Sequence, residues 1–166
     1  MPVLTFNGQL RRYAGVVLDW DSEEEVKLMT LRIGSKLNCR VLLVEDGLDN
    51  QNLIARVLRK AGADVSVAEN GQVAVDLALA AKQAERAFDI ILMDIQMPVM
   101  DGYEATRQLR KAGHTAPIIA LTAYAMTENH QKCIEAGCDD YMTKPFDLPT
   151  LAAVIAKHVT RESLPS

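Results

Sequence analysis

Four apolar stretches of the sequence lead into side chains that could hold a cation beside an anion. Glu45 and Asp46 follow the first of these stretches, Asp94 ends the second, and Thr122 and Lys144 come after the last two. Three carboxylates at one place repel one another, so they need raised pKa values or a bound cation. Carboxylate oxygens suit Mg²⁺, whereas a hydroxyl and an ammonium suit an oxygen-rich anion. The set is typical of phosphoryl transfer onto an aspartate, and Asp94 is the best nucleophile candidate because it ends the most apolar stretch.

The elements that would bring these residues together are parallel strands and the helices between them. Short apolar runs predict buried strands at 41–44, 64–67, 90–93, 118–121 and 140–142. Helical periodicity and glycine stop signals predict helices near 50–61, 71–84, 103–111, 127–136 and 148–159. Because strand and helix alternate five times, we expect an α/β fold with a doubly wound, five-stranded parallel sheet. The strand order 2-1-3-4-5 would bring the polar strand ends to one edge.

The first 38 residues follow a different pattern. The dipeptide Asn7-Gly8 is typical of a hairpin turn. A capping box and an apolar stripe at helical spacing follow it, formed by Ser22, Glu25, Val26, Met29, Ile33 and Leu37. We therefore expect a small hairpin or extended piece and then one amphipathic helix. This segment is either a linker that packs on the main domain or a helix that binds a partner or forms a dimer.

Composition excludes several classes of protein. The 166 residues suffice for one domain with a short extension. The net charge of −4 argues against direct binding of nucleic acid, and no apolar run is long enough to span a membrane. The N-terminus lacks the order of a signal peptide, so we expect the protein in the cytoplasm. Three cysteines without a CxxC pair predict neither a disulfide framework nor a zinc site. The three histidines are expected at the surface: His114, His130 and His158.

Four stretches of the chain carry a resemblance to a known family. They read VLLVEDGLDNQ, ILMDIQMPVMDGYEATRQLR, PIIALTAYA and GCDDYMTKPFDLPTL. Together they resemble the receiver domain of two-component response regulators, over about residues 39–160. The second stretch is most similar to receivers attached to hybrid sensor histidine kinases. The resemblance implies the flavodoxin-like receiver fold and the transfer of a phosphoryl group from a phosphohistidine.

The resemblance also implies a role for each polar residue at the strand ends. Glu45 and Asp46 would be the acidic pair that holds Mg²⁺. Asp94 would be the phosphoacceptor and a further metal ligand, and the backbone carbonyl of Gln96 would complete the protein ligands.

Three more positions match residues that the family uses around the phosphoryl group. Thr122 and Lys144 would contact phosphoryl oxygens, and Tyr141 would be the aromatic switch residue. Phosphorylation would then be read out on the face formed by the fourth helix, the fifth strand and the fifth helix. Tyr124 lies two residues beyond Thr122, where it would shield the phosphoryl group and slow self-hydrolysis.

The sequence departs from its relatives at one position of the site and leaves other readings open. Gly47 stands where many hybrid-kinase receivers have Asn, which puts the capping of the first helix in doubt. A degenerate receiver used only for docking is one alternative. An aspartyl-phosphate hydrolase is another, although Gln96 stands where that class needs a general acid. Any enzymatic activity would be limited to self-phosphorylation and self-dephosphorylation, and the missing Gly-rich loop excludes a Rossmann domain.

We therefore expect a receiver domain over 39–160 with an N-terminal extension over 1–38 and a tail over 161–166. The expected partner is a histidine kinase or a histidine phosphotransfer protein, or the kinase core of its own longer chain. We expect no direct contact with nucleic acid or membrane, and a weak dimer is left open.

Overall fold

The computed structural model describes residues 11–13, 16–18, 36–123, 127–144, 146 and 148–163. Five strands form one parallel sheet in the spatial order β4-β3-β5-β6-β7. Their bounds are β3 Arg40–Val44, β4 Asp64–Ala68, β5 Ile90–Asp94, β6 Ile118–Thr122 and β7 Asp140–Thr143. Counted along the chain within this sheet, the order is 2-1-3-4-5, so the predicted fold class is confirmed.

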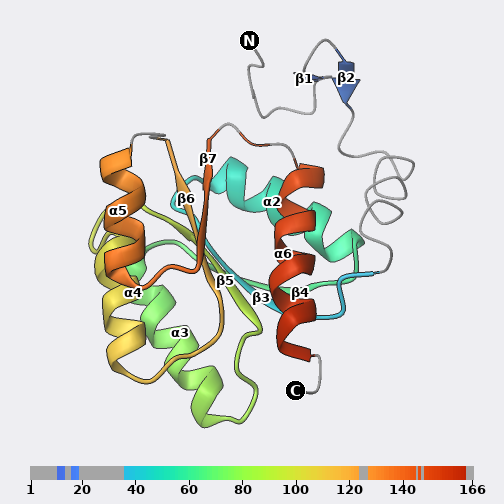
Figure 1. The fold of residues 1–166 in the computed structure, drawn as a ribbon. Helices are drawn as coiled ribbons and strands as arrows, with labels where there is room; N and C mark the ends of the chain where they lie inside the picture. Colours follow the sequence, from blue (N-terminus) through green and yellow to red (C-terminus); the bar gives the residue numbers. More distant parts are fainter. Residues whose placement is uncertain are drawn as a thin grey trace.

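Helices alternate with these strands and cover both faces of the sheet (Figure 1). Their bounds are α2 Leu48–Lys60, α3 Gly71–Gln83, α4 Gly102–Lys111, α5 Thr127–Ala136 and α6 Leu148–Ser163. The helices α2 and α6 lie on one face, and α3, α4 and α5 lie on the other. None of the described helices is both long enough and apolar enough to cross a membrane.

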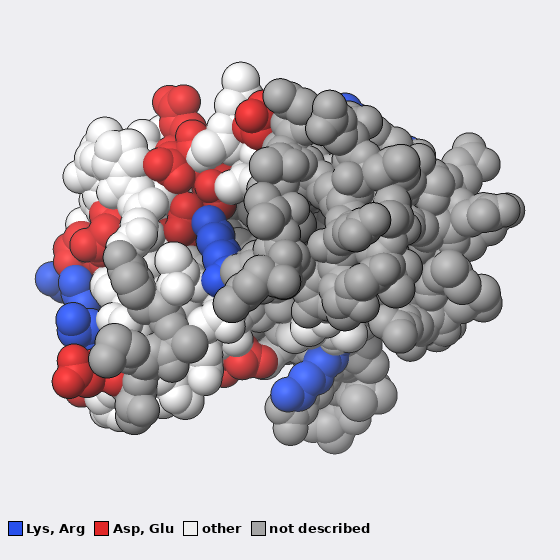
Figure 2. Space-filling model, turned by 90° about the horizontal axis from the view of Figure 1, so that it is seen from above, with Lys and Arg blue, Asp and Glu red and all other residues white. Residues whose placement is uncertain are grey.

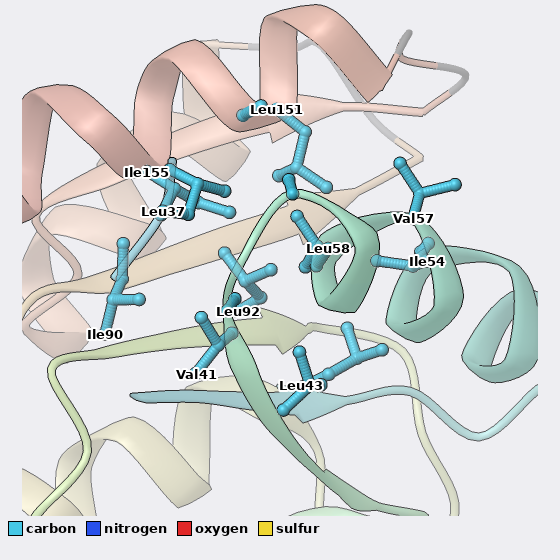
Figure 3. Packing of buried hydrophobic residues seen from close by; sticks show 14 of the residues in the cluster. Leu37, Val41, Leu43, Ile54, Val57, Leu58, Ile90, Leu92, Leu151 and Ile155 are labelled. Carbon is cyan, nitrogen blue, oxygen red and sulfur yellow. The ribbon is translucent and has the colours of Figure 1, made fainter. Parts of the chain in front are cut away.

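The alternation of side chains along the central strands divides the core into two layers. Val41 and Leu43 of β3 pack with α2 and α6, whereas Leu42 and Val44 pack with α3 and α4. All four side chains are fully buried. Figure 3 shows the first layer, in which residues of α2 and α6 meet those of β3 and β5. Helices on both faces thus explain why these central strands are apolar at every position except their ends.

The N-terminal part contains a separate antiparallel pair, β1 (Arg11–Tyr13) with β2 (Val16–Leu18). The predicted turn at Asn7-Gly8 lies outside the described residues. So does the predicted capping box with most of the helical stripe.

Leu37 is the described end of that stripe, and it corrects the prediction. It is not helical and precedes β3, where its backbone N–H donates to the carbonyl of Ala61 at 2.8 Å. Its side chain is buried in the layer between the sheet and the helices α2 and α6 (Figure 3). The apolar side chain at this position therefore serves the main core.

Two helix ends also bear on the predictions. The N-cap of α2 is Gly47, which makes no side-chain capping bond, as its residue type led us to expect. By contrast, Asn70 and Asp101 cap α3 and α4 with side-chain oxygens. The helix α6 continues to Ser163, four residues beyond the end at 159 that the sequence pattern predicts. The bound of the receiver domain at residue 160 and the tail over 161–166 stay predictions.

Arg110 forms hydrogen bonds between several segments at the edge of the sheet where the strands begin. Its Nε donates to the carbonyl of Gly137 at 2.9 Å, and its Nη1 donates to the carbonyls of His114 and Ala116 at 2.9 and 2.8 Å. Its Nη2 lies 2.6 Å from a carboxylate oxygen of Asp139. One guanidinium thus ties α4 to the segments that enter β6 and β7.

The histidines differ from the prediction that all three lie at the surface. His130 is exposed, but His114 is only 5% exposed, because the chain turns inward there from α4 toward β6. Its Nε2 is buried without a hydrogen-bond partner. His158 is half-buried, and its Nε2 lies 3.1 Å from a carboxylate oxygen of Asp140.

Replacement of Arg110 by Met should lower the free energy of unfolding by about 2–4 kcal/mol, because three carbonyls lose this donor and Asp139 loses its ion-pair partner. Arg110→Lys should restore little of it, since an ammonium cannot span all these acceptors. Arg107→Met is the matched control. Arg107 lies on the same helix in an exposed pair with Glu104, so its loss should cost less than about 0.5 kcal/mol. Urea denaturation measures all three variants, and equal losses for Arg110→Met and Arg107→Met would contradict the assigned role.

Acid should destabilise the fold through His114. Burial and the nearby charges of Arg110 and Lys82 lower the pKa of this ring below its ordinary value of 6.5. As the pH falls through 6.5, the unfolded chain takes up a proton that the folded chain refuses, so the free energy of unfolding falls. The difference in stability between wild type and His114→Phe should therefore shift against the wild type from pH 8 to pH 5. Urea denaturation at both pH values tests this, and a constant difference would show that His114 does not contribute.

Candidate functional site

The residues singled out in the sequence gather at the carboxyl edge of the sheet. Glu45 and Asp46 follow β3, Asp94 and Thr122 end β5 and β6, and Lys144 follows β7. Figure 2 views this edge and shows acidic side chains gathered around a basic one. The strand order brings these residues together, because β3 lies beside β5, and β6 lies between β5 and β7.

The three carboxylates form one cluster. Glu45, Asp46 and Asp94 each offer an oxygen within 4.8 Å of the other two. Glu45 and Asp94 are 2% and 5% exposed, whereas Asp46 is open to solvent. Oxygen ligands of this kind, with one side open to water, fit the needs of Mg²⁺.

Lys144 places its ammonium between the two buried carboxylates. Its Nζ lies 3.0 Å from Oε2 of Glu45 and 3.3 Å from Oδ2 of Asp94. The backbone N–H of Lys144 donates to the carbonyl of Thr122 at 2.7 Å, which fixes the start of the lysine loop against β6. One positive charge therefore faces two buried negative charges.

The other oxygens of the two buried carboxylates have backbone or amide donors. Oε1 of Glu45 accepts from the N–H of Gly47 at 3.2 Å and from the side-chain amide of Asn50 at 3.4 Å. Oδ1 of Asp94 accepts from the N–H of Gln96 at 3.3 Å. Gln96 thus lies beside Asp94 as expected, while the role of its carbonyl as a metal ligand stays a prediction.

The charges in this cluster shift the pKa values of its members. Burial and the neighbouring charge of Glu45 raise the pKa of Asp94 to about 7, although Lys144 acts in the opposite direction. Burial alone would lower the pKa of Lys144, but the charges of Asp94 and Glu45 outweigh it, so this pKa is raised. The folded state therefore holds an excess of negative charge that a cation would relieve.

Two backbone features after β5 shape the rim of the site. A Cβ at Gly102 would overlap the carbonyl of Asp94, so the glycine lets α4 begin directly against the end of the strand. Val99, in the loop between them, has a φ of 69° and is 83% exposed. A β-branched residue in this left-handed region is strained, which is a feature of functional loops.

Thr122 and Tyr141 lie on β6 and β7. Thr122 is buried, at 2% exposure, next to the cluster. Tyr141 is half-buried and lies opposite Ala120 in the strand register, two residues before the level of Thr122 at the carboxyl edge. Its ring contacts that of His130 from α5, with the centroids 4.3 Å apart. The sequence pattern did not predict the contact of His130 with Tyr141, because the packing of the fold decides which helix faces Tyr141.

Tyr124 lies outside the part of the chain that the structure describes, in the segment between β6 and α5. The predicted shielding by Tyr124 stays a prediction.

Comparison with known proteins points to one family. The family model described as the response regulator receiver domain matches residues 41–156. A hybrid signal transduction histidine kinase of Dictyostelium discoideum is 42% identical over 127 residues, which are 74% of this chain and 7% of that protein. A two-component response regulator of Oryza sativa is also 42% identical, over 71% of this chain and 92% of that protein. The chain thus spans less than a tenth of the hybrid kinase.

Two solved structures extend the likeness to the fold. One is the receiver domain of a sensor histidine kinase from Pseudomonas aeruginosa with a magnesium ion coordinated in its active site cleft. It has a TM-score of 0.63 and 40% identity, over 74% of this chain and 98% of that one. The other is a Saccharomyces cerevisiae receiver domain in complex with a histidine phosphotransfer signaling protein, with a TM-score of 0.68 and 33% identity over 76% and 92%.

Removal of the buried charge at Asp94 should stabilise the metal-free protein. At pH 8, Asp94→Asn should raise the free energy of unfolding by about 1–3 kcal/mol, because the carboxylate is buried beside Glu45 and its pKa is raised. The amide oxygen can still accept from the N–H of Gln96. Asp46→Asn, which changes an exposed carboxylate of the same cluster, should have a smaller effect. Denaturation in the presence of a chelator measures both, and a destabilised Asp94→Asn would contradict the charge balance described above.

Proposed function

Because the chain belongs to the response regulator receiver domain family, we propose that it accepts a phosphoryl group from a phosphohistidine onto Asp94. The observation that carries the proposal is the ammonium of Lys144 between the buried carboxylates of Glu45 and Asp94. This arrangement keeps a nucleophilic carboxylate beside a group that can bind phosphoryl oxygens. The chain would thus be the phosphoacceptor of a two-component phosphorelay.

The transfer exchanges one bond for another. A carboxylate oxygen of Asp94 attacks the phosphorus, an O–P bond forms, and the N–P bond to the donor histidine breaks. Lys144 binds an oxygen of the transferred group, and the hydroxyl of Thr122 donates to another. Glu45 and Asp46, with Asp94 and the carbonyl of Gln96, are the residues that would hold Mg²⁺. The ion would neutralise charge on the carboxylates and the phosphoryl oxygens.

The donor is a histidine kinase or a histidine phosphotransfer protein. Supporting this choice, a structural neighbour is a receiver in complex with a histidine phosphotransfer protein. Several sequence relatives are hybrid kinases, in which a receiver is part of a much longer chain. A kinase core in the same chain is therefore a second source of the phosphoryl group, and the cytoplasm is the compartment where we place the reaction.

The phosphorylated state would be read out through Thr122 and Tyr141. The new group adds about −1.5 to −2 charge and three acceptor oxygens. Movement of the Thr122 hydroxyl toward it would vacate space behind β6, into which the ring of Tyr141 can turn. The face of α5, β7 and α6 would then differ between the two states, as a population shift.

Acetyl phosphate with Mg²⁺ should phosphorylate the wild type at Asp94 alone, and beryllofluoride should bind at the same place. Asp94→Asn should lose both reactions, because an amide is not a nucleophile. Asp76→Asn, on the exposed side of α3, is the matched control and should react like the wild type. Mass mapping of the phosphorylated residue decides the matter, and a phosphoryl group on any other residue would overturn the proposal.

Mg²⁺ at millimolar concentration should raise the melting temperature, because it binds the folded cluster and not the unfolded chain. The effect should be smaller in Asp46→Ala, which lacks one ligand but keeps the buried pair of Glu45 and Asp94. Thermal unfolding with and without Mg²⁺ measures both. Identical melting curves for the wild type would contradict the metal site.

A further inference from the structure

Tyr141 is held on its solvent side by a histidine of the neighbouring helix. The rings of Tyr141 and His130 lie 4.3 Å apart between centroids and are inclined by 41°. His130 is exposed on α5, whereas Tyr141 is half-buried against Ile95, Ala120 and Cys133. Ring pairs of this kind stabilise the arrangement in which they form. The contact therefore favours the position that Tyr141 occupies here.

On the side toward Thr122, Tyr141 packs next to a small residue, Ala120. In the register of β6 and β7, Tyr141 is opposite Ala120, which lies two residues before Thr122 on the same face of the sheet. A cavity of about 370 Å³ is lined by Thr122, Ile95 and Tyr103 together with residues of the neighbouring loops and α5. Ile95 belongs to the cluster against which Tyr141 packs, and Tyr103 packs against the same cluster. The cavity thus adjoins Thr122 and the cluster that packs against Tyr141, and a ring that turns toward Thr122 moves away from His130.

The backbone at this point is fixed independently of the ring. A carboxylate oxygen of Asp140 accepts from the N–H of Tyr141 at 2.8 Å, and its other oxygen lies 3.1 Å from Nε2 of His158 on α6. The strand is therefore anchored to α6, and the side chain of Tyr141 is the part that can change its contact. The ring contact with His130 is then a specific restraint on that movement.

We propose that His130 is a positioning residue whose ring contact stabilises Tyr141 in the unphosphorylated packing and so weakens the response to the phosphoryl group. We call this contact between His130 and Tyr141 the latch. The inference rests on the proposed function, because it needs Tyr141 to be the switch. Coupling between two sites is reciprocal, so a contact that must break on phosphorylation also lowers the affinity of the site for a phosphoryl analogue. Removal of the latch should make such an analogue bind more tightly.

The experiment measures the affinity of beryllofluoride in the presence of Mg²⁺ by titration of the full chain. His130→Ala should bind about 2- to 10-fold more tightly than the wild type, the range that one aromatic pair allows. His130→Phe keeps a ring at this position and should restore the wild-type affinity. Lys132→Ala, an exposed residue of the same helix, is the matched control and should leave the affinity unchanged.

The same substitution made in a Tyr141→Ala variant tests whether the effect of His130 depends on the ring of Tyr141. In Tyr141→Ala, the further change His130→Ala should have no effect, because the ring that it restrains is absent. A wild-type affinity in His130→Ala, or the same gain in the Tyr141→Ala background, would overturn the latch while beryllofluoride binding upholds the proposed function. Absence of beryllofluoride binding in the wild type would overturn the proposed function and the latch with it.

Discussion

The functional edge of this protein depends on one unequal arrangement of charges, a single lysine facing two buried carboxylates. The ammonium of Lys144 contacts both Glu45 and Asp94, and neither carboxylate reaches enough water to dissipate its charge. Isolated buried charge is so unfavourable that such a cluster persists only when the rest of the fold supplies the stability. Here the stability comes from two apolar layers, one packed on each face of the sheet.

The two edges of the sheet deal with polar groups in opposite ways. At the edge where the strands begin, Arg110 donates hydrogen bonds to three carbonyls and pairs with one carboxylate, so these polar groups have their partners within the chain. At the carboxyl edge, a single lysine supplies positive charge to two buried carboxylates. At the same edge, α2 begins without a side-chain cap, and Val99 has a strained backbone conformation. The local rules that stabilise a fold are broken where a metal and a phosphoryl group would complete the site.

Most of the fold and the positions of the site residues could be predicted from the sequence, because they follow from patterns within single elements. Each predicted strand lies within one residue of its bounds, since five apolar runs separated by helical stretches allow few topologies. Strand ends are equally readable, so the meeting of Glu45, Asp94 and Lys144 follows once the strand order is known. The prediction for Leu37 was wrong, because an apolar residue at helical spacing can equally belong to a non-helical segment whose side chain packs in the main core, as here before β3.

The contacts between elements could not be predicted in the same way. The type of His130 says nothing about Tyr141, since the pairing depends on how α5 is rotated against β7. The sequence predicts His114 at the surface, and only the inward turn of the chain toward β6 buries it. In each case the missing information is the relative placement of two elements and not the nature of either one.

The fold holds Asp94 in an unfavourable charge environment, buried beside Glu45. An NMR titration of the carboxyl carbon of Asp94 in metal-free solution measures this environment. We expect a pKa of about 7, in place of the ordinary 3.8, and a lower value once Mg²⁺ is added. A pKa near 3.8 without metal would contradict it, because Lys144 would then balance the cluster alone and nothing in the site would call for a further cation.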